Sequence, residues 1–124
     1  SSHGCDWLGE CSDETRNLRF LPEGWDSYSA IAPDPRLLEA GVSLIRGLCS
    51  GAAIPRPDVA PTPNGGVQFS WSNGNRYFEI EIVGEGAAIY MYEDTDTNEL
   101  YDVELFVQEF LDDVISLIER VGNS

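Results

Sequence analysis

Between Val67 and Tyr92 the sequence alternates between apolar and polar residues, and this alternation limits the possible folds more than any other feature. Successive side chains of a β-strand point to opposite faces, so the alternation predicts strands with one apolar face. Two turn signals, Asn73-Gly74 and Glu85-Gly86, divide the segment, and Asn-Gly is the strongest short hairpin signal. We therefore predict an antiparallel meander with three clear strands.

The two turns also predict which residues face each other. If both are two residues long, Phe69 pairs with Phe78 in the first hairpin and Ile82 pairs with Ile89 in the second. Both pairs fall on the apolar face, so the register agrees with the pattern. The opposite face is then expected to carry Gln68, Ser70, Tyr77, Glu79, Glu81, Tyr90 and Tyr92.

Helical patterns flank the meander on both sides. Asp34 is a good N-cap residue, Pro35 suits the first helical position, and Gly51 is suited to end this first helix. A second apolar stripe predicts a final helix from about residue 103 to residue 121. Between the first helix and the meander, four prolines favour an extended, edge-like segment around residues 58–62.

Together these elements predict the α+β class: an antiparallel β-meander of three or four strands with two helices packed on one face, in α-β-β-β-α order. We expect a single domain over residues 21–124. Residues 1–20 are expected to be irregular, and their Ser-Ser-His-Gly start is typical of a cloning remnant. The predicted core consists of Val67, Phe69, Phe78, Ile80, Ile82, Ile89, Phe106, Phe110, Val114 and Leu117.

Acidic residues dominate the charge of the chain. Twenty-two aspartates and glutamates oppose seven basic residues, all of them arginine, and the net charge is −15. Such a surface repels nucleic-acid phosphates and anionic lipid headgroups, and it attracts basic protein surfaces. The predicted element order is also that of the double-stranded-RNA-binding domain, but that domain needs a basic face. We therefore expect a basic protein partner, no direct nucleic-acid binding and no membrane association, although acidity can also serve solubility alone.

The cysteines predict no disulfide framework. Cys5, Cys11 and Cys49 are an odd set, and Cys49 falls within the first predicted helix. This usage favours a reducing cytoplasm. His3, Cys5 and Cys11 could supply three zinc ligands, but their spacing matches no familiar structural site and a fourth ligand is missing.

One acidic segment partly matches a calcium-binding loop. Asp94, Asp96 and Asn98 have the spacing that opens an EF-hand loop. Glu99 then stands where that loop needs glycine, and Leu105 stands where it needs a bidentate glutamate. We expect no cofactor and no metal, with Asp94, Asp96 and Asn98 as weak candidates for binding calcium or magnesium.

The usual groups of nucleophilic catalysis are missing from the sequence. Its one histidine is His3, and no lysine is present to form a Schiff base. Carboxylates and tyrosines remain for acid–base chemistry, and Glu79 and Glu81 are predicted to share a strand face. We expect no enzymatic activity, with a small carboxylate-based enzyme as an alternative.

Two large aromatics, Trp25 and Tyr28, precede the first predicted helix. We expect them to lie over the open end of the core, assisted by Leu21 and Ile31. Gly24 permits an unusual turn there. The alternative is that the aromatics are exposed and bind a ligand.

Residues 21–83 contain Gly-Trp-Asp-Ser-Tyr-Ser-Ala, then the first predicted helix, Pro-Arg-Pro, and Pro-Thr-Pro-Asn-Gly-Gly-Val-Gln-Phe-Ser-Trp. This order resembles the recurring pattern of a group of small bacterial proteins of no established activity: Gly-Trp-Asp-Gly-Tyr-Gly-Ala, a helix, Pro-x-Pro, and Pro-Thr-Pro-Asp-Gly-Gly-Val-x-Leu-x-Trp. In this chain Ser27 and Ser29 replace two of the glycines, and Asn64 replaces the aspartate. The resemblance implies a bacterial or phage origin and no particular chemistry. The matching residues are Trp25, Asp26, Tyr28, Pro61, Thr62, Pro63, Gly65, Gly66 and Trp71.

The sequence therefore favours a non-enzymatic, acidic protein-binding module that neutralises or regulates a basic partner, as an antitoxin, immunity protein or anti-defence inhibitor does. An acidic DNA mimic that inhibits a nucleic-acid-binding protein is the alternative, and it would need carboxylates in rows at phosphate-like spacing. Aromatic side chains supply contact area and acids select basic partners. The predicted partner-binding residues are Tyr77, Glu79, Glu81, Tyr90 and Tyr92.

Overall fold

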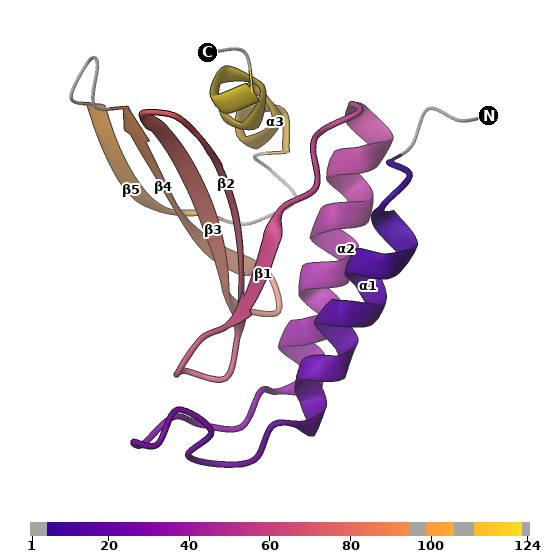
Figure 1. Cartoon of the computed structure of the whole chain (residues 1–124), viewed down its shortest axis with the longest axis vertical. Coiled ribbons are helices and arrows are strands. Elements are labelled where there is room, and N and C mark those ends of the chain that lie inside the picture. The colour runs from indigo at the N-terminus through magenta and orange to yellow at the C-terminus, as the bar shows by residue number, and fades with distance from the viewer. Residues whose placement is uncertain (1–4, 95–98, 106–110, 123–124) are drawn as a thin grey trace.

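The computed structural model describes residues 5–94, 99–105 and 111–122 as helices on an antiparallel sheet (Figure 1). The described strands form a five-stranded sheet in the order β1-β2-β3-β4-β5. They are β1 (Asp58–Pro61), β2 (Val67–Asn73), β3 (Arg76–Gly84), β4 (Ala87–Asp94) and β5 (Glu99–Leu105). The helices are α1 (Leu8–Asn17), α2 (Pro35–Gly51) and α3 (Leu111–Gly122), with a short 3-10 helix, η1 (Leu18–Phe20), after α1.

The α+β class is confirmed, but the predicted α-β-β-β-α order is wrong. Helix α1 lies within residues 1–20, which were expected to be irregular, and β5 occupies residues 99–105. The predicted final helix therefore starts too early, because residues 103–105 belong to a strand and α3 begins at Leu111. Phe106 and Phe110, expected in the core, lie outside the described residues.

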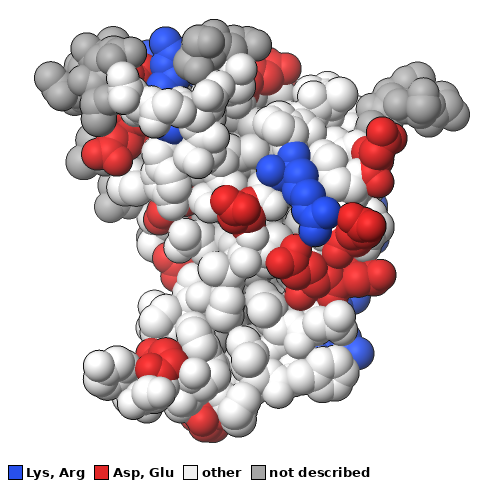
Figure 2. Space-filling view, in the orientation of Figure 1, with Lys and Arg blue, Asp and Glu red and all other residues white. Residues whose placement is uncertain are grey.

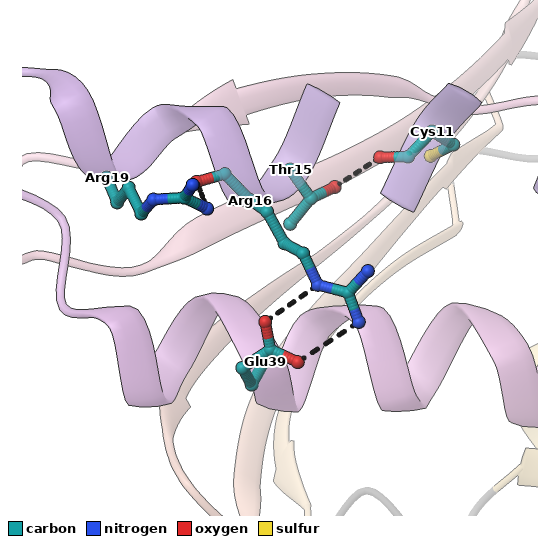
Figure 3. Close-up of polar contacts among 5 residues, drawn as sticks. All are labelled: Cys11, Thr15, Arg16, Arg19 and Glu39. Carbon is teal, nitrogen blue, oxygen red and sulfur yellow. Dashed lines mark hydrogen bonds and ion pairs between the residues drawn. The ribbon is translucent and has the colours of Figure 1, made fainter. Parts of the chain in front are cut away.

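Helix α1 has no row of large hydrophobic residues to reveal it in the sequence. Its buried side chains are Cys11, Ser12 and Thr15. The Thr15 hydroxyl donates a hydrogen bond to the Cys11 carbonyl at 2.8 Å, so this buried hydroxyl has a hydrogen-bond partner (Figure 3). Arg16 links α1 to α2, with its Nε 2.8 Å and its Nη2 3.2 Å from the two carboxylate oxygens of Glu39 (Figure 3). Small and polar residues thus form the contact face, and hydrophobic periodicity misses it.

Helix α2 begins and ends where the sequence predicts. The Asp34 side chain accepts a hydrogen bond from the Arg36 backbone N–H at 2.9 Å, as an N-cap residue does. A Cβ added at Gly41 would lie 2.8 Å from Cγ1 of Val67, so α2 lies directly on the sheet at this point. Figure 1 shows α2 and α3 on the same side of the sheet.

The first hairpin keeps its predicted faces but not its predicted pairs. Asn73 pairs with Arg76, so the two turn residues are Gly74 and Asn75. Gly74 has φ +62°, which suits the first central position of a type II′ turn. Phe69 therefore faces Ile80, not Phe78. The shift is two residues along β3, and a shift of two leaves every side chain on its original face.

The second hairpin contains a β-bulge that the sequence did not reveal. Gly84 pairs with Ala87 around the predicted Glu85-Gly86 turn, but Ile82 pairs with Ala88. Val83 is therefore an extra residue in β3, and β4 is displaced by one position. Because strand side chains alternate, this displacement reverses the faces predicted for β4.

The core lies between the sheet and the helices. Of the predicted core residues that the structure describes, two are only half-buried: Ile89, which the bulge moves to the other face, and Leu117. Tyr92 and Ala88 take the inner positions on β4. The buried predicted residues are Val67, Phe69, Phe78, Ile80, Ile82 and Val114.

Cys5 and Cys49 form a disulfide, contrary to the expectation from the odd cysteine count. It joins the segment before α1 to the last turns of α2 across a sequence separation of 44 residues. Near it, the Trp7 indole Nε1 donates to the Ile54 carbonyl at 3.1 Å. Cys11 is the free cysteine among the described residues, and it is buried. Cys5 is thus not available for the zinc set considered above.

We predict that the disulfide makes a large contribution to stability. Closing a loop of this length restricts the unfolded chain by up to about 4 kcal/mol in the chain-entropy model. Reduction with dithiothreitol should therefore lower the melting temperature measured by circular dichroism. Thiol titration of the denatured, unreduced protein should find one thiol, and the Cys5→Ser variant should show two. Three thiols in the wild type would contradict the disulfide.

Candidate functional site

The sheet has an outer face, turned away from the helices, that carries a compact group of polar and apolar side chains. Cross-strand pairing places Gln68 and Ser70 beside Glu81 and Glu79, and these two glutamates lie beside Ile89 and Met91. We call these side chains, together with Tyr77, the outer sheet face. Its members are Gln68, Ser70, Tyr77, Glu79, Glu81, Ile89 and Met91.

Only part of the predicted binding set lies on that face. Tyr77, Glu79 and Glu81 do, but the expectation that Tyr90 and Tyr92 join them is wrong. The bulge at Val83 turns both tyrosines toward the helices. Tyr90 pairs with Ile80, and its ring lies 5.7 Å from that of Phe78.

Tyr92 has a structural role instead. It is fully buried, and its hydroxyl donates to Oδ2 of Asp94 at 3.1 Å. Asp94 is itself 1% exposed and lies 3.3 Å from Nε of Arg76. The guanidinium of Arg120, on α3, lies 4.9 Å from the centre of the Tyr92 ring. These contacts hold α3 against the sheet, and burial followed by the bond to Asp94 raises the pKa of Tyr92.

Of the three weak metal candidates, the structure describes only Asp94. Asp94 is engaged by Tyr92 and Arg76, whereas Asp96 and Asn98 lie outside the described residues. Within residues 5–94, 99–105 and 111–122, no group of three or more histidine, cysteine, aspartate or glutamate side chains is placed to hold a metal ion.

The ionisable side chains of the outer sheet face interact with one another through a hydrogen bond and through charge repulsion. The Tyr77 hydroxyl donates to Oε1 of Glu79 at 2.6 Å. Burial, and then the bond and charge of Glu79, raise the pKa of Tyr77 to about 12. Burial and repulsion from Glu79 raise the pKa of Glu81, while a hydrogen bond with Thr62 acts in the opposite direction. Glu81 thus carries its charge at an energetic cost.

The ion pairs of the described residues leave Glu79 and Glu81 without an arginine. Arg16, Arg36, Arg56 and Arg76 pair with other carboxylates, mostly on or next to the helices. Two adjacent carboxylates therefore remain beside the half-buried Ile89 and Met91. This combination can accept a cation from outside together with apolar contact.

A groove of about 540 Å³ opens between the β1–β2 edge and α3. Its walls include Arg56, Asp58 and Glu119, and Trp71, whose Nε1 donates to the Pro55 carbonyl at 2.7 Å. The described residues that line it include no histidine, cysteine or lysine. They therefore form no nucleophile–base pair of the Ser-His or Cys-His kind.

The loop between η1 and α2 differs from its predicted role. Tyr28 is 85% exposed and Ile31 is 52% exposed, so they do not close the core as expected. Trp25 is half-buried, and its Nε1 donates to the Ile31 carbonyl at 3.3 Å. The two aromatics in the sequence did mark this loop as unusual. The exposure of Tyr28 agrees with the alternative expectation, in which the aromatics are exposed and do not close the core.

Comparison with family models, curated proteins and solved structures found no match to this chain. The described helices also include none with the length and apolar character needed to cross a membrane. The function proposed below therefore rests on the chemistry of the outer sheet face.

The raised pKa of Glu81 predicts a pH-dependent effect of its charge. The folded state binds the Glu81 proton more tightly than the unfolded chain does, so ionisation costs stability as pH rises through the folded pKa. Glu81→Gln should raise the melting temperature at neutral pH, and the gain should vanish below the ordinary pKa of 4.5. Glu119→Gln, at an exposed position on α3, is the matched control. An equal gain at both pH values would refute this account.

Proposed function

We propose that this protein is a non-enzymatic binding module that neutralises or regulates a basic protein partner through its outer sheet face. The observation that carries the proposal is the adjacent pair Glu79 and Glu81, which no arginine neutralises among the described ion pairs. In a chain of net charge −15, this pair faces outward beside apolar side chains.

An arginine or lysine from a partner would relieve the repulsion between the two carboxylates. Glu79 is already oriented by the Tyr77 hydroxyl at 2.6 Å, so less side-chain entropy is lost on binding. Ile89 and Met91 would add apolar contact at the same place. The overall charge would increase the association rate, and added salt would reduce that rate.

The same face supports a docking module over a DNA mimic. A mimic needs unbroken rows of carboxylates. Here the register places the apolar Ile89 and Met91 of β4 between the pair Glu81 and Glu79 on β3 and the acidic positions Glu104 and Asp102 on β5. An acidic pair beside apolar side chains fits a protein surface with a cationic group next to an apolar one.

The disulfide supports a location other than the expected cytoplasm. Disulfides persist in oxidising compartments and are rare in the cytosol. From the Cys5–Cys49 bridge we infer that the module acts in an oxidising environment, in place of the expected cytoplasm.

Capture from a cell extract of the source organism, followed by purification of the captured protein and direct binding measurements, tests the proposal. We expect a basic partner whose association slows as salt is added. The double variant Glu79→Gln/Glu81→Gln should weaken binding by about tenfold or more, equivalent to about 1.4 kcal/mol.

Asp13→Asn/Asp112→Asn is the matched control, because it removes the same charge from exposed positions on α1 and α3. It should change the association rate slightly and leave the dissociation rate unchanged. Equal losses in the two double variants would show that net charge alone drives binding. Unchanged binding in the Glu79/Glu81 variant would rule out the outer sheet face.

A further inference from the structure

The exposed large hydrophobic side chains of the described residues all lie in the segment that precedes α2. They are Phe20, Tyr28 and Ile31, which are 70%, 85% and 52% exposed. We call residues 20–34, which contain all three, the aromatic loop. Single exposed hydrophobics are normal on protein surfaces, but grouped ones mark interaction sites. Tyr28 and Ile31 are close neighbours in the chain, so this loop is a candidate contact site.

Internal hydrogen bonds order the backbone around Tyr28. Asp26 Oδ1 accepts from the backbone N–H groups of Tyr28, at 2.9 Å, and Ala30, at 3.3 Å. The Gly24 N–H donates to the Ala30 carbonyl at 2.8 Å. The exposed ring of Tyr28 is therefore presented from an ordered turn. Little backbone entropy is lost when such a side chain is bound.

The aromatic loop carries two carboxylates that no arginine neutralises. Glu23 is exposed and Asp26 is half-buried, and neither belongs to an ion pair of the described residues. Glu23 Oε2 accepts from the Ala32 N–H at 2.8 Å, and Asp26 bonds to backbone N–H groups as described above. An ionised carboxylate that accepts such bonds keeps its charge. Negative charge and exposed apolar side chains therefore occur together in this loop.

The surroundings of the aromatic loop are also acidic. Arg36 is shared between Asp34, at 3.2 Å, and Glu85, at 3.7 Å. The guanidinium of Arg19 lies 4.5 Å from the centre of the Phe20 ring, at the start of the loop. Figure 2 shows acidic groups among uncharged side chains at the end of the molecule that holds this loop in Figure 1. Carboxylates thus outnumber arginines here, which is complementary to a basic surface.

The aromatic loop adjoins the outer sheet face at the turn between β1 and β2. The Ile31 N–H donates to the Pro63 carbonyl at 2.9 Å. Pro63 directly follows Thr62, which hydrogen-bonds with Glu81 of the outer sheet face. Figure 1 shows the loop passing beneath this turn. A stable interface involves about 20–30 residues on each side, more than the outer sheet face contains, so a protein bound beside Glu81 needs the neighbouring surface as well.

We propose that the aromatic loop is a second contact for the basic partner, with Tyr28 as its anchor. The inference rests on the proposed function for the class of partner, and it adds a second place on the surface. A partner arginine or lysine would lie on the Tyr28 ring, with Glu23 and Asp26 supplying the opposite charge. Ile31 would contact the apolar stem of that side chain. A second copy of this acidic chain would instead meet like charge.

Nuclear magnetic resonance titration of the isotope-labelled full chain tests this proposal. The probes are two synthetic peptides of equal length and charge, one alternating arginine and leucine, the other alternating arginine and serine. The Trp25 indole N–H reports on the loop, because it donates to the Ile31 carbonyl at 3.3 Å. The Trp7 indole N–H donates to the Ile54 carbonyl and is the internal reference. We expect the arginine–leucine peptide to shift the Trp25 signal and the backbone signals of the loop, with the Trp7 signal unchanged.

Tyr28→Ser/Ile31→Ser should raise the Kd of the arginine–leucine peptide by about tenfold, because tyrosine anchors commonly dominate the binding energy of an interface. The Kd of the arginine–serine peptide should rise much less, since that peptide has little apolar contact to lose. Both sites are exposed, so circular dichroism and the melting temperature should match the wild type.

Charge variants separate the loop from the net charge of the chain. Glu23→Gln/Asp26→Asn keeps side-chain oxygens that can accept the backbone N–H bonds, and it should weaken the binding of both peptides. Asp13→Asn/Asp112→Asn removes the same charge from exposed positions on α1 and α3 and should weaken both by less. Equal losses in these two double variants would contradict a local role for Glu23 and Asp26.

Four results would each overturn the proposal. They are no binding of either peptide at low salt, equal wild-type affinity for the two peptides, unchanged affinity in the folded Tyr28/Ile31 variant, and loop signals that do not shift during binding. Sedimentation equilibrium without peptide tests the other occupant. A wild-type dimer that the Tyr28/Ile31 variant loses would assign the loop to a second copy and would also overturn the proposal.

Glu79→Gln/Glu81→Gln distinguishes this proposal from the proposed function. If that variant alone weakens binding, the aromatic loop is not a contact and the proposed function stands. If the Tyr28/Ile31 variant alone weakens binding, the loop contact stands and the outer sheet face is ruled out. Weaker binding in both variants supports a partner that spans the two surfaces.

Discussion

One extra residue in β3 determines which side chains lie on each face of the sheet. Ile82 pairs with Ala88 and Gly84 pairs with Ala87, so Val83 has no counterpart in β4. In a regular hairpin Ile89 and Met91 would point toward the helices. The bulge instead places Tyr90 and Tyr92 inside and leaves Ile89 and Met91 on the outer sheet face. The composition of both faces depends on this irregularity.

The inward position of Tyr92 has consequences for the charges of the molecule. Its hydroxyl bonds to Asp94, which pairs with Arg76, and Arg120 lies over its ring. Arg76 Nη1 also donates to the Arg120 carbonyl at 2.9 Å. Two of the seven arginines are therefore used where α3 meets the sheet. The same bulge thus places arginines at the helix contact and leaves Glu79 and Glu81 on the opposite face.

Patterns within single elements predicted much of the fold. The Asp34-Pro35 start of α2, the alternation of β2 and β3 and the position of the second turn are all local signals, and the structure contains all three. The bulge has no such signal, because Val83 fits a regular strand as well as a bulged one. Helix α1 was missed because its buried face is Cys11, Ser12 and Thr15.

The candidate sites show the same division between local and distant information. Glu79 and Tyr77 lie on one strand, so their shared face follows from alternation, and the structure has them in contact. Tyr90 and Tyr92 depended on the register of the next strand, and their placement failed. The cysteine pairing failed for a similar reason, since Cys5 and Cys49 are 44 residues apart and meet only once α1 packs on α2.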